Sequence, residues 1–183
     1  VTIRDCEIQK ANSYGLVVCN NGSVECDDVR ISGYTTSTEE DSIGVDLRGT
    51  QRCAMKRVSV RGFRYGIALF NCSGPKDFNF AHCNVTEAYV GFRSEQSPSL
   101  VAIENCQLSV AYAGVHVVNQ SKCTIAKSII ESSVNSMLQY GLLIDDASMS
   151  VRDCDIHNVS SGGIFLRAGC IFEADDVRLN SVA

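Results

Sequence analysis

The residues best suited to bind a ligand are charged side chains that recur at fixed distances behind glycines. In seven segments a glycine is followed by alternating residues, as in GVDL at Gly44 and GVHV at Gly114. The glycine is expected at a bend whose backbone conformation a Cβ would strain. In an extended segment, the residues two and four places after the glycine point to the same side. We therefore predict one binding face, which carries Asp46, Arg48, Arg93, Glu95, His116 and Asp145.

A second set of segments repeats through the whole chain. Eight segments have apolar residues at their first, third, sixth and eighth positions, as in VTIRDCEI at Val1 and VAIENCQL at Val101. They start near residues 1, 24, 53, 78, 101, 123, 149 and 172, and this spacing is typical of solenoid repeats. The period of two excludes helical repeats, and the lack of hairpin turn signals favours strands stacked in parallel. We expect one all-β domain over residues 1–183.

Together the two patterns resemble the right-handed parallel β-helix repeat of the pectate-lyase-like superfamily. The resemblance rests on inward apolar columns, on Gly-led strands, and on a corner with Asp5, Asp28, Asn105, Asp153 and Asp176. Three coils have a different residue at this corner: Arg57, His82 and Lys127. An uninterrupted asparagine ladder is therefore not expected. The resemblance implies a right-handed parallel β-helix of about eight coils. No capping helix covers either end of the pattern, so we expect a segment of a longer β-helix.

Enzymes with this fold act on polysaccharides along an exposed strand face, which makes a carbohydrate-active β-helix the alternative function. The resemblance leaves open a lyase, a hydrolase, an epimerase or a phage tailspike segment. Glycoside hydrolysis uses two carboxylates about 5 Å or about 6.5–9.5 Å apart. Glu95 and Asp145 should lie two coils apart, about 9–10 Å at the backbone. Carboxylates do not stack in adjacent coils as a calcium site would need, and no nucleophile triad or nucleotide motif is present. We predict no catalytic residue, no metal and no cofactor.

A protein or peptide is the partner that the predicted face favours, with a polysaccharide as the alternative. Trp is absent, and the two outward columns contribute mainly Phe70 and Phe165 as rings for sugar stacking. The mixture of charged and apolar residues is typical of a protein-binding surface. Arg93 is the expected anchor, because its guanidinium can bind a carboxylate or stack on a ring, whereas His116 should gain charge below about pH 6.5. We predict a non-catalytic scaffold or interaction module, similar in style to the β-helices of F-box substrate receptors.

Charge and hydropathy exclude two other classes of partner. The formal net charge is −5 and no basic block occurs, so nucleic acid is not expected. No apolar stretch approaches the roughly 20 residues that span a bilayer, so no membrane is expected either. Insertions around residues 35–41 and 132–139 leave the same corner, and they could flank a groove on the Gly-led face.

The ten cysteines indicate the compartment. Cys6, Cys83, Cys106 and Cys154 share one inward column, which suits small buried thiols rather than disulfides. There is no CxxC pair and no Cys–His spacing of the zinc type. Reduced thiols favour a cytoplasmic location. Five Asn-X-Ser/Thr sequons, from Asn21 onward, support a secreted or virion-surface protein as the alternative.

Overall fold

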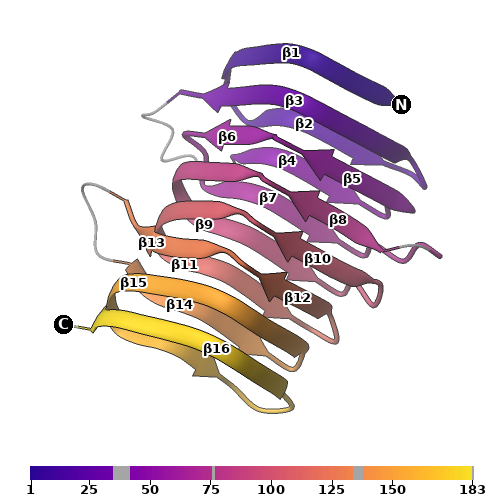
Figure 1. Ribbon diagram of the computed structural model, residues 1–183. Coiled ribbons are helices and arrows are strands. Elements are labelled where there is room, and N and C mark those ends of the chain that lie inside the picture. The colour runs from indigo at the N-terminus through magenta and orange to yellow at the C-terminus, as the bar shows by residue number, and fades with distance from the viewer. Residues whose placement is uncertain (35–41, 76, 134–137, 183) are drawn as a thin grey trace.

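The computed structural model describes residues 1–34, 42–75, 77–133 and 138–182, and it is an all-β, right-handed parallel β-solenoid of about seven coils (Figure 1). The strands stack from β1 at one end to β16 at the other, and each coil lies on the last. The predicted fold class is confirmed. The eighth repeated segment forms β16, which pairs in parallel with the first two thirds of β15. Most of the two predicted insertions, residues 35–41 and 134–137, lie outside the described residues, and so does the groove between them.

Each coil has three strand faces. The first face consists of β5 (Arg52–Lys56), β8 (Phe78–Ala81), β10 (Leu100–Glu104), β12 (Lys122–Ala126) and the starts of β1 (Thr2–Ala11), β3 (Ser23–Gly33), β15 (Ser148–Leu166) and β16 (Ile171–Val182). The second face continues along these four long strands and includes β6 (Ser59–Arg61), β13 (Ile129–Ser132) and the starts of β9 (Asn84–Glu95) and β11 (Gln107–Val118). The third, which we call the Gly-led face, consists of β2 (Tyr14–Cys19), β4 (Ile43–Arg48), β7 (Tyr65–Phe70), β14 (Leu138–Asp145) and the ends of β9, β11 and β15.

The pairing register matches the one that the repeated segments predict. Ile103 in β10 pairs with Phe80 in β8 on one side and with Ile125 in β12 on the other. All three side chains are buried in the single large core that fills the solenoid. Because parallel in-register stacking places equivalent residues on top of one another, each inward position becomes a continuous apolar column.

The corner between the first and second faces explains its own residue preference. All eight corner residues have a left-handed backbone with φ between 47° and 54°: Asp5, Asp28, Arg57, His82, Asn105, Lys127, Asp153 and Asp176. Asn and Asp tolerate this conformation better than other residues with a Cβ. The three coils with Arg, His or Lys at this corner have the same left-handed backbone. Stacking of the coils therefore imposes this conformation even on residues that favour it less.

Buried thiols and hydroxyls satisfy backbone donors directly after these corners. The backbone N–H of Cys83 donates to Sγ of Cys106 at 3.3 Å, and the N–H of Cys106 donates to Oγ of Ser128 at 3.1 Å. A second corner repeats the arrangement, where the N–H of Cys72 donates to Oγ of Ser97 at 3.1 Å. Cys and Ser therefore have the same role in these columns, as small acceptors for the N–H of the preceding coil.

The glycines that open the third face are required by close packing rather than by backbone conformation. Positive φ values occur at Gly49, Gly62 and Gly169 among the described glycines, and at none that opens a strand of this face. A Cβ on Gly114 would instead lie against the Ile130 side chain and 2.7 Å from the carbonyl oxygen of Gly141. The expectation that backbone strain requires glycine here was therefore wrong. Glycine is required because the next coil approaches too closely to leave room for a Cβ.

Candidate functional site

All six predicted binding residues lie on the Gly-led face, in two columns of in-register neighbours. The first column runs Val17, Asp46, Ala68, Arg93, His116, Leu143 and Phe165. The second runs Cys19, Arg48, Phe70, Glu95, Val118 and Asp145. The strands that carry the two columns follow one another along the solenoid: β2, β4, β7, β9, β11, β14 and β15 (Figure 1).

Every carboxylate of the set has an arginine partner. Arg48 Nε lies 3.0 and 2.8 Å from the two oxygens of Asp46. A terminal nitrogen of Arg93 lies 2.7 Å from Glu95 Oε2. The third pair joins Arg167 Nη1 and Asp145 Oδ2 at 3.2 Å. Glu95 and Asp145 remain two coils apart, so this set of residues contains no pair of free carboxylates of the kind that glycoside hydrolysis uses.

Asp46 is a buried carboxylate rather than a surface group. Its side chain is 2% exposed, whereas the side chain of Arg48 is 53% exposed. The Arg48 side chain reaches back across Asp46 towards the Tyr14 ring, 6.0 Å from its guanidinium carbon. The carboxylate therefore cannot contact a partner and instead holds the guanidinium in place.

Arg93 also lies against rings. Its guanidinium carbon is 5.3 Å from the centre of the Tyr65 ring and 5.9 Å from that of Phe70, and Nη1 donates to the Tyr65 hydroxyl at 3.2 Å. On the other side of Phe70, the guanidinium of Arg48 lies 5.5 Å from the ring centre. Phe70 thus lies between two arginines from neighbouring coils, a favourable cation–π arrangement. Ala68, the neighbour of Arg93 in the adjacent strand, is fully buried even though it belongs to the outward column.

Five of the six tyrosines belong to this face, and the predicted binding set does not include them. Tyr14, Tyr65 and Tyr140 directly precede the glycine that opens their strand, and Tyr89 and Tyr112 lie two places before it. The prediction used only the positions after the glycine. Counting aromatic residues at the two positions before each glycine would have found them.

The tyrosines and Phe165 form a line of ring contacts along the solenoid. Tyr89 and Tyr112 are stacked with their centres 4.7 Å apart, Tyr112 and Tyr140 meet edge to face at 5.6 Å, and Tyr140 lies 5.1 Å from Phe165. Arg64 lies over Tyr89 at 5.1 Å. One ring pair of this line is stacked, the other two meet edge-on or tilted, and a guanidinium lies over Tyr89, so the ring faces are partly occupied. This geometry is less suitable for stacking a sugar than an open ring face is.

Beneath these rings is a small apolar cluster outside the solenoid core. Val90, Ala113 and Leu143 are buried, with Tyr65, Tyr112 and Tyr140 packed against them. Burial of apolar groups on the outer surface of the sheet fixes the tyrosine side chains in place. The face is therefore rigid as well as aromatic.

His116 lies in the first column between Arg93 and Leu143. The pKa of His116 is lowered to about 4, mainly by burial and then by the charges of Arg93 and Arg167. The carboxylates of Glu95 and Asp145 raise this pKa, but by less than the two arginines lower it. The imidazole is therefore neutral at pH 7. The expected gain of charge below about pH 6.5 is wrong for this environment, because an imidazolium here would be desolvated and would lie beside two guanidiniums.

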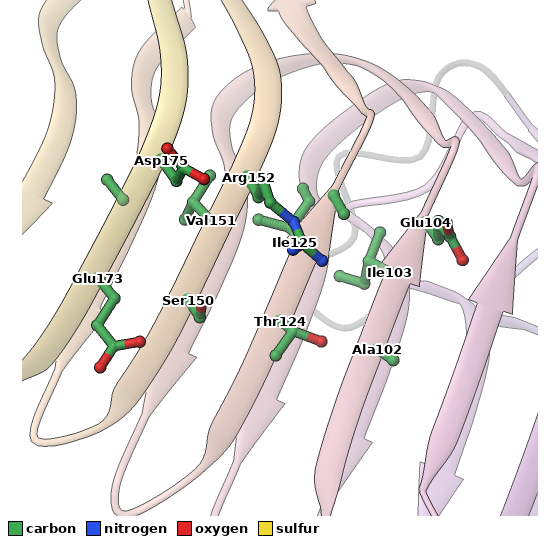
Figure 2. A pocket seen from close by; sticks show the side chains of 12 residues that line it. Ala102, Ile103, Glu104, Thr124, Ile125, Ser150, Val151, Arg152, Glu173 and Asp175 are labelled. Carbon is green, nitrogen blue, oxygen red and sulfur yellow. The ribbon is translucent and has the colours of Figure 1, made fainter.

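A hollow of about 600 Å³ lies on the first face, away from the binding face that the sequence predicts (Figure 2). Ala102, Thr124 and Ser150 form its floor on adjacent strands, because outward positions there carry small side chains. Longer polar side chains surround the floor, among them Glu104, Arg152, Glu173 and Asp175. The sequence feature that could have indicated this hollow is the small residue at the second position of three successive repeated segments, which start at residues 101, 123 and 149.

Metal clusters and membrane-spanning helices are both absent from the part of the chain that the structure describes. No group of three or more His, Cys, Asp or Glu side chains in the described ranges is placed to hold a metal ion. No helix within those ranges is long and apolar enough to cross a membrane.

Comparison with known proteins finds one family model that matches part of the chain. The sequence model of the family described as right handed beta helix region matches residues 94–181. Neither the curated proteins nor the solved structures include a match. The matched range covers the coils from the end of β9 to β16, and the same strand register continues through the coils before it.

Proposed function

We propose that this right-handed parallel β-solenoid, whose later coils match the right handed beta helix family model, is a non-catalytic module which binds a protein or peptide through the Gly-led face. The solenoid supplies a rigid scaffold on which side chains recur at steps of about 4.8 Å. Such a regular surface suits an extended partner, because successive residues of the partner can contact successive coils.

The observation that carries the proposal is the concentration of tyrosine, phenylalanine and arginine on this one face. Tyr and Arg are enriched at the centres of protein interfaces because they offer large contact area together with hydrogen bonds. Here the ion pairs and the outer apolar cluster already fix many of these side chains. Little side-chain entropy is then lost on binding, which favours affinity.

A carbohydrate-active β-helix remains the second candidate, and the hollow on the first face supports it. Its floor carries the Thr124 and Ser150 hydroxyls, and Glu104 and Arg152 at its rim could accept and donate hydrogen bonds to a glycan. None of the described side chains that line the hollow is aromatic. On the Gly-led face, the ring faces are partly occupied by other rings or by arginines. Both facts favour the peptide over the glycan.

A reducing compartment such as the cytoplasm is part of the same proposal. All ten cysteines are free thiols, and seven of them are buried. Four of the five sequon asparagines have a left-handed backbone at corners: Asn21, Asn71, Asn119 and Asn158. A corner that favours Asn for its backbone generates such triplets without any role in glycosylation.

Peptide display followed by affinity measurement tests the function. Peptides selected from a random library against the chain would be measured by fluorescence anisotropy. The Tyr89→Ala/Phe165→Ala variant removes two rings that are 42% and 38% exposed, and we expect about tenfold weaker binding. The matched control is Ile129→Ala on the second face, where Ile129 is 41% exposed.

The control variant should bind within about twofold of the wild-type chain. Binding that depends on Ile129 and not on the two rings would overturn the choice of face. A glycan array run in parallel tests the second candidate. Glycan binding without any selectable peptide would replace the proposed function with the carbohydrate one.

A further inference from the structure

The ion pair of Asp46 and Arg48 is oriented, with the negative charge buried and the positive charge outward. Asp46 is 2% exposed and Arg48 is 53% exposed. Arg48 uses Nε for both carboxylate oxygens, and Tyr14 is its other side-chain hydrogen-bond partner. A guanidinium carries five N–H donors, so its outer edge keeps donors that no carboxylate of the described chain takes.

The other arginines paired on this face differ from Arg48. Arg93 is 24% exposed and uses its two terminal nitrogens for Glu95 and Tyr65. Arg167 is exposed, but its partner Asp145 is 37% exposed, so that pair presents both charges to solvent. Of these three paired arginines, Arg48 is therefore the one that combines an exposed guanidinium with a buried carboxylate partner.

Aromatic and apolar side chains surround the guanidinium of Arg48. Its guanidinium carbon lies between the rings of Tyr14 and Phe70, at 6.0 and 5.5 Å. Tyr14 is 41% exposed, and Val17 in the same strand is 48% exposed. The hydrogen bond to Asp46 raises the pKa of Arg48, which keeps the cation charged. An anion at the outer edge could accept two parallel N–H bonds while neighbouring apolar groups contact the rings and Val17.

We propose that Arg48, held by Asp46 between Tyr14 and Phe70, is an anchor for an acidic side chain of the partner peptide. The inference rests on the proposed function and deepens it: the partner segment carries Asp or Glu next to an apolar residue. It also moves the anchor from Arg93, which the structure places in an internal network, to Arg48.

NMR titration with defined probes tests this assignment. The probes are an acetylated and amidated tetrapeptide with two glutamates and two apolar residues, its glutamine counterpart, and an all-apolar tetrapeptide with a free C-terminal carboxylate. The readout is the side-chain Nε–Hε signal of each arginine in the whole chain. We expect the glutamate peptide to shift the Arg48 signal saturably and the glutamine peptide to leave it nearly unchanged.

Variants separate the anchor from a structural role. Arg48→Ala should weaken binding of the glutamate peptide at least fivefold, and Arg48→Lys, which keeps the charge without the fork, should give an intermediate loss. Asp46→Asn should weaken binding as well, because the guanidinium is no longer held. The matched control is Arg178→Ala, which removes another exposed arginine paired with a carboxylate, Asp155, on the second face.

Three outcomes would overturn the assignment: equal shifts with the glutamine peptide, equal sensitivity to Arg178→Ala, or preference for the free C-terminal carboxylate. Failure of this inference can be told from failure of the proposed function. Selected peptides that depend on Tyr89 and Phe165 but not on Arg48 refute the anchor alone. Selected peptides that do not depend on the Gly-led face refute both.

Discussion

Arg93 and Tyr65, in adjacent coils, are joined by a hydrogen bond of 3.2 Å and by a cation–π contact in which the guanidinium carbon lies 5.3 Å from the ring centre. The same guanidinium binds Glu95 at 2.7 Å, which in turn accepts a bond from Asn119 at 3.4 Å. Arg93 thus connects strands β7 and β9 on the outside of the sheet. A side chain with this many partners stabilises the fold, in contrast to an ordinary outward residue on a strand.

Replacing Arg93 should therefore reduce stability. Arg93→Ala removes the ion pair and the cation–π contacts, and we expect a loss of about 1–2 kcal/mol in the free energy of unfolding. Urea denaturation followed by circular dichroism measures it. Arg178→Ala, which removes a more exposed ion pair, should stay within about 0.5 kcal/mol. Equal effects of the two variants would contradict the network.

The sequence was sufficient to predict the fold because its signal is one of periodicity. Equivalent apolar residues such as Phe80, Ile103 and Ile125 recur at matching positions, and in-register stacking needs little more than that match. The reason for the glycines could not be derived in the same way. It depends on how closely the Gly141 carbonyl approaches Gly114, a distance that only the stacked coils define.

A glycine pair gives a direct test of this packing. Gly114→Ala places a methyl group against Ile130 and 2.7 Å from the Gly141 oxygen, so we expect a loss of about 1–3 kcal/mol. At Gly162 a Cβ would have its nearest contact at 3.9 Å, with the Tyr140 ring. Gly162→Ala should be neutral or stabilising by up to about 1 kcal/mol. Thermal unfolding of both variants decides, and a tolerated Gly114→Ala would refute the steric explanation.

Thiol reactivity should follow burial. Burial raises the pKa of Cys123 to about 12 and raises that of Cys53, so neither forms thiolate at neutral pH. Iodoacetamide labelling of the native protein, read by mass spectrometry, should modify Cys6 and Cys19, which are exposed. The buried thiols should react only after denaturation. A disulfide between stacked cysteines in protein kept without reductant would contradict both the columns and the reducing compartment.

The pH dependence of stability should contain a contribution from His116. Its pKa is about 4 in the folded protein and about 6.5 when unfolded, so the unfolded state binds the proton more readily between these values. Stability from this group is complete above about pH 6.5 and is lost as the pH falls towards 4. Over that window, the wild-type chain should lose stability more steeply than His116→Gln, by at most about 1.4 kcal/mol per pH unit. Parallel slopes for the two proteins would show that His116 is not desolvated.

The sequence predicted where the residues of the candidate site lie, but not which of their side chains are buried and which are exposed. Alternation after each glycine correctly placed Asp46, Arg48 and Arg93 on one face. It could not show that Asp46 is buried, because burial depends on the paths of neighbouring side chains such as Arg48, which donates to both Asp46 oxygens. Which arginine is exposed depends on such side-chain paths, and these do not follow from a repeat pattern.

Backbone chemical-shift mapping with a display-selected peptide tests the central claim most directly. We expect the largest amide shifts at saturation in β4 and β7 and in the ends of β9, β11 and β15 that form the Gly-led face, with Arg48 and Tyr65 among them. Shifts concentrated instead on β10, β12 and β16 around the hollow of the first face would contradict the claim.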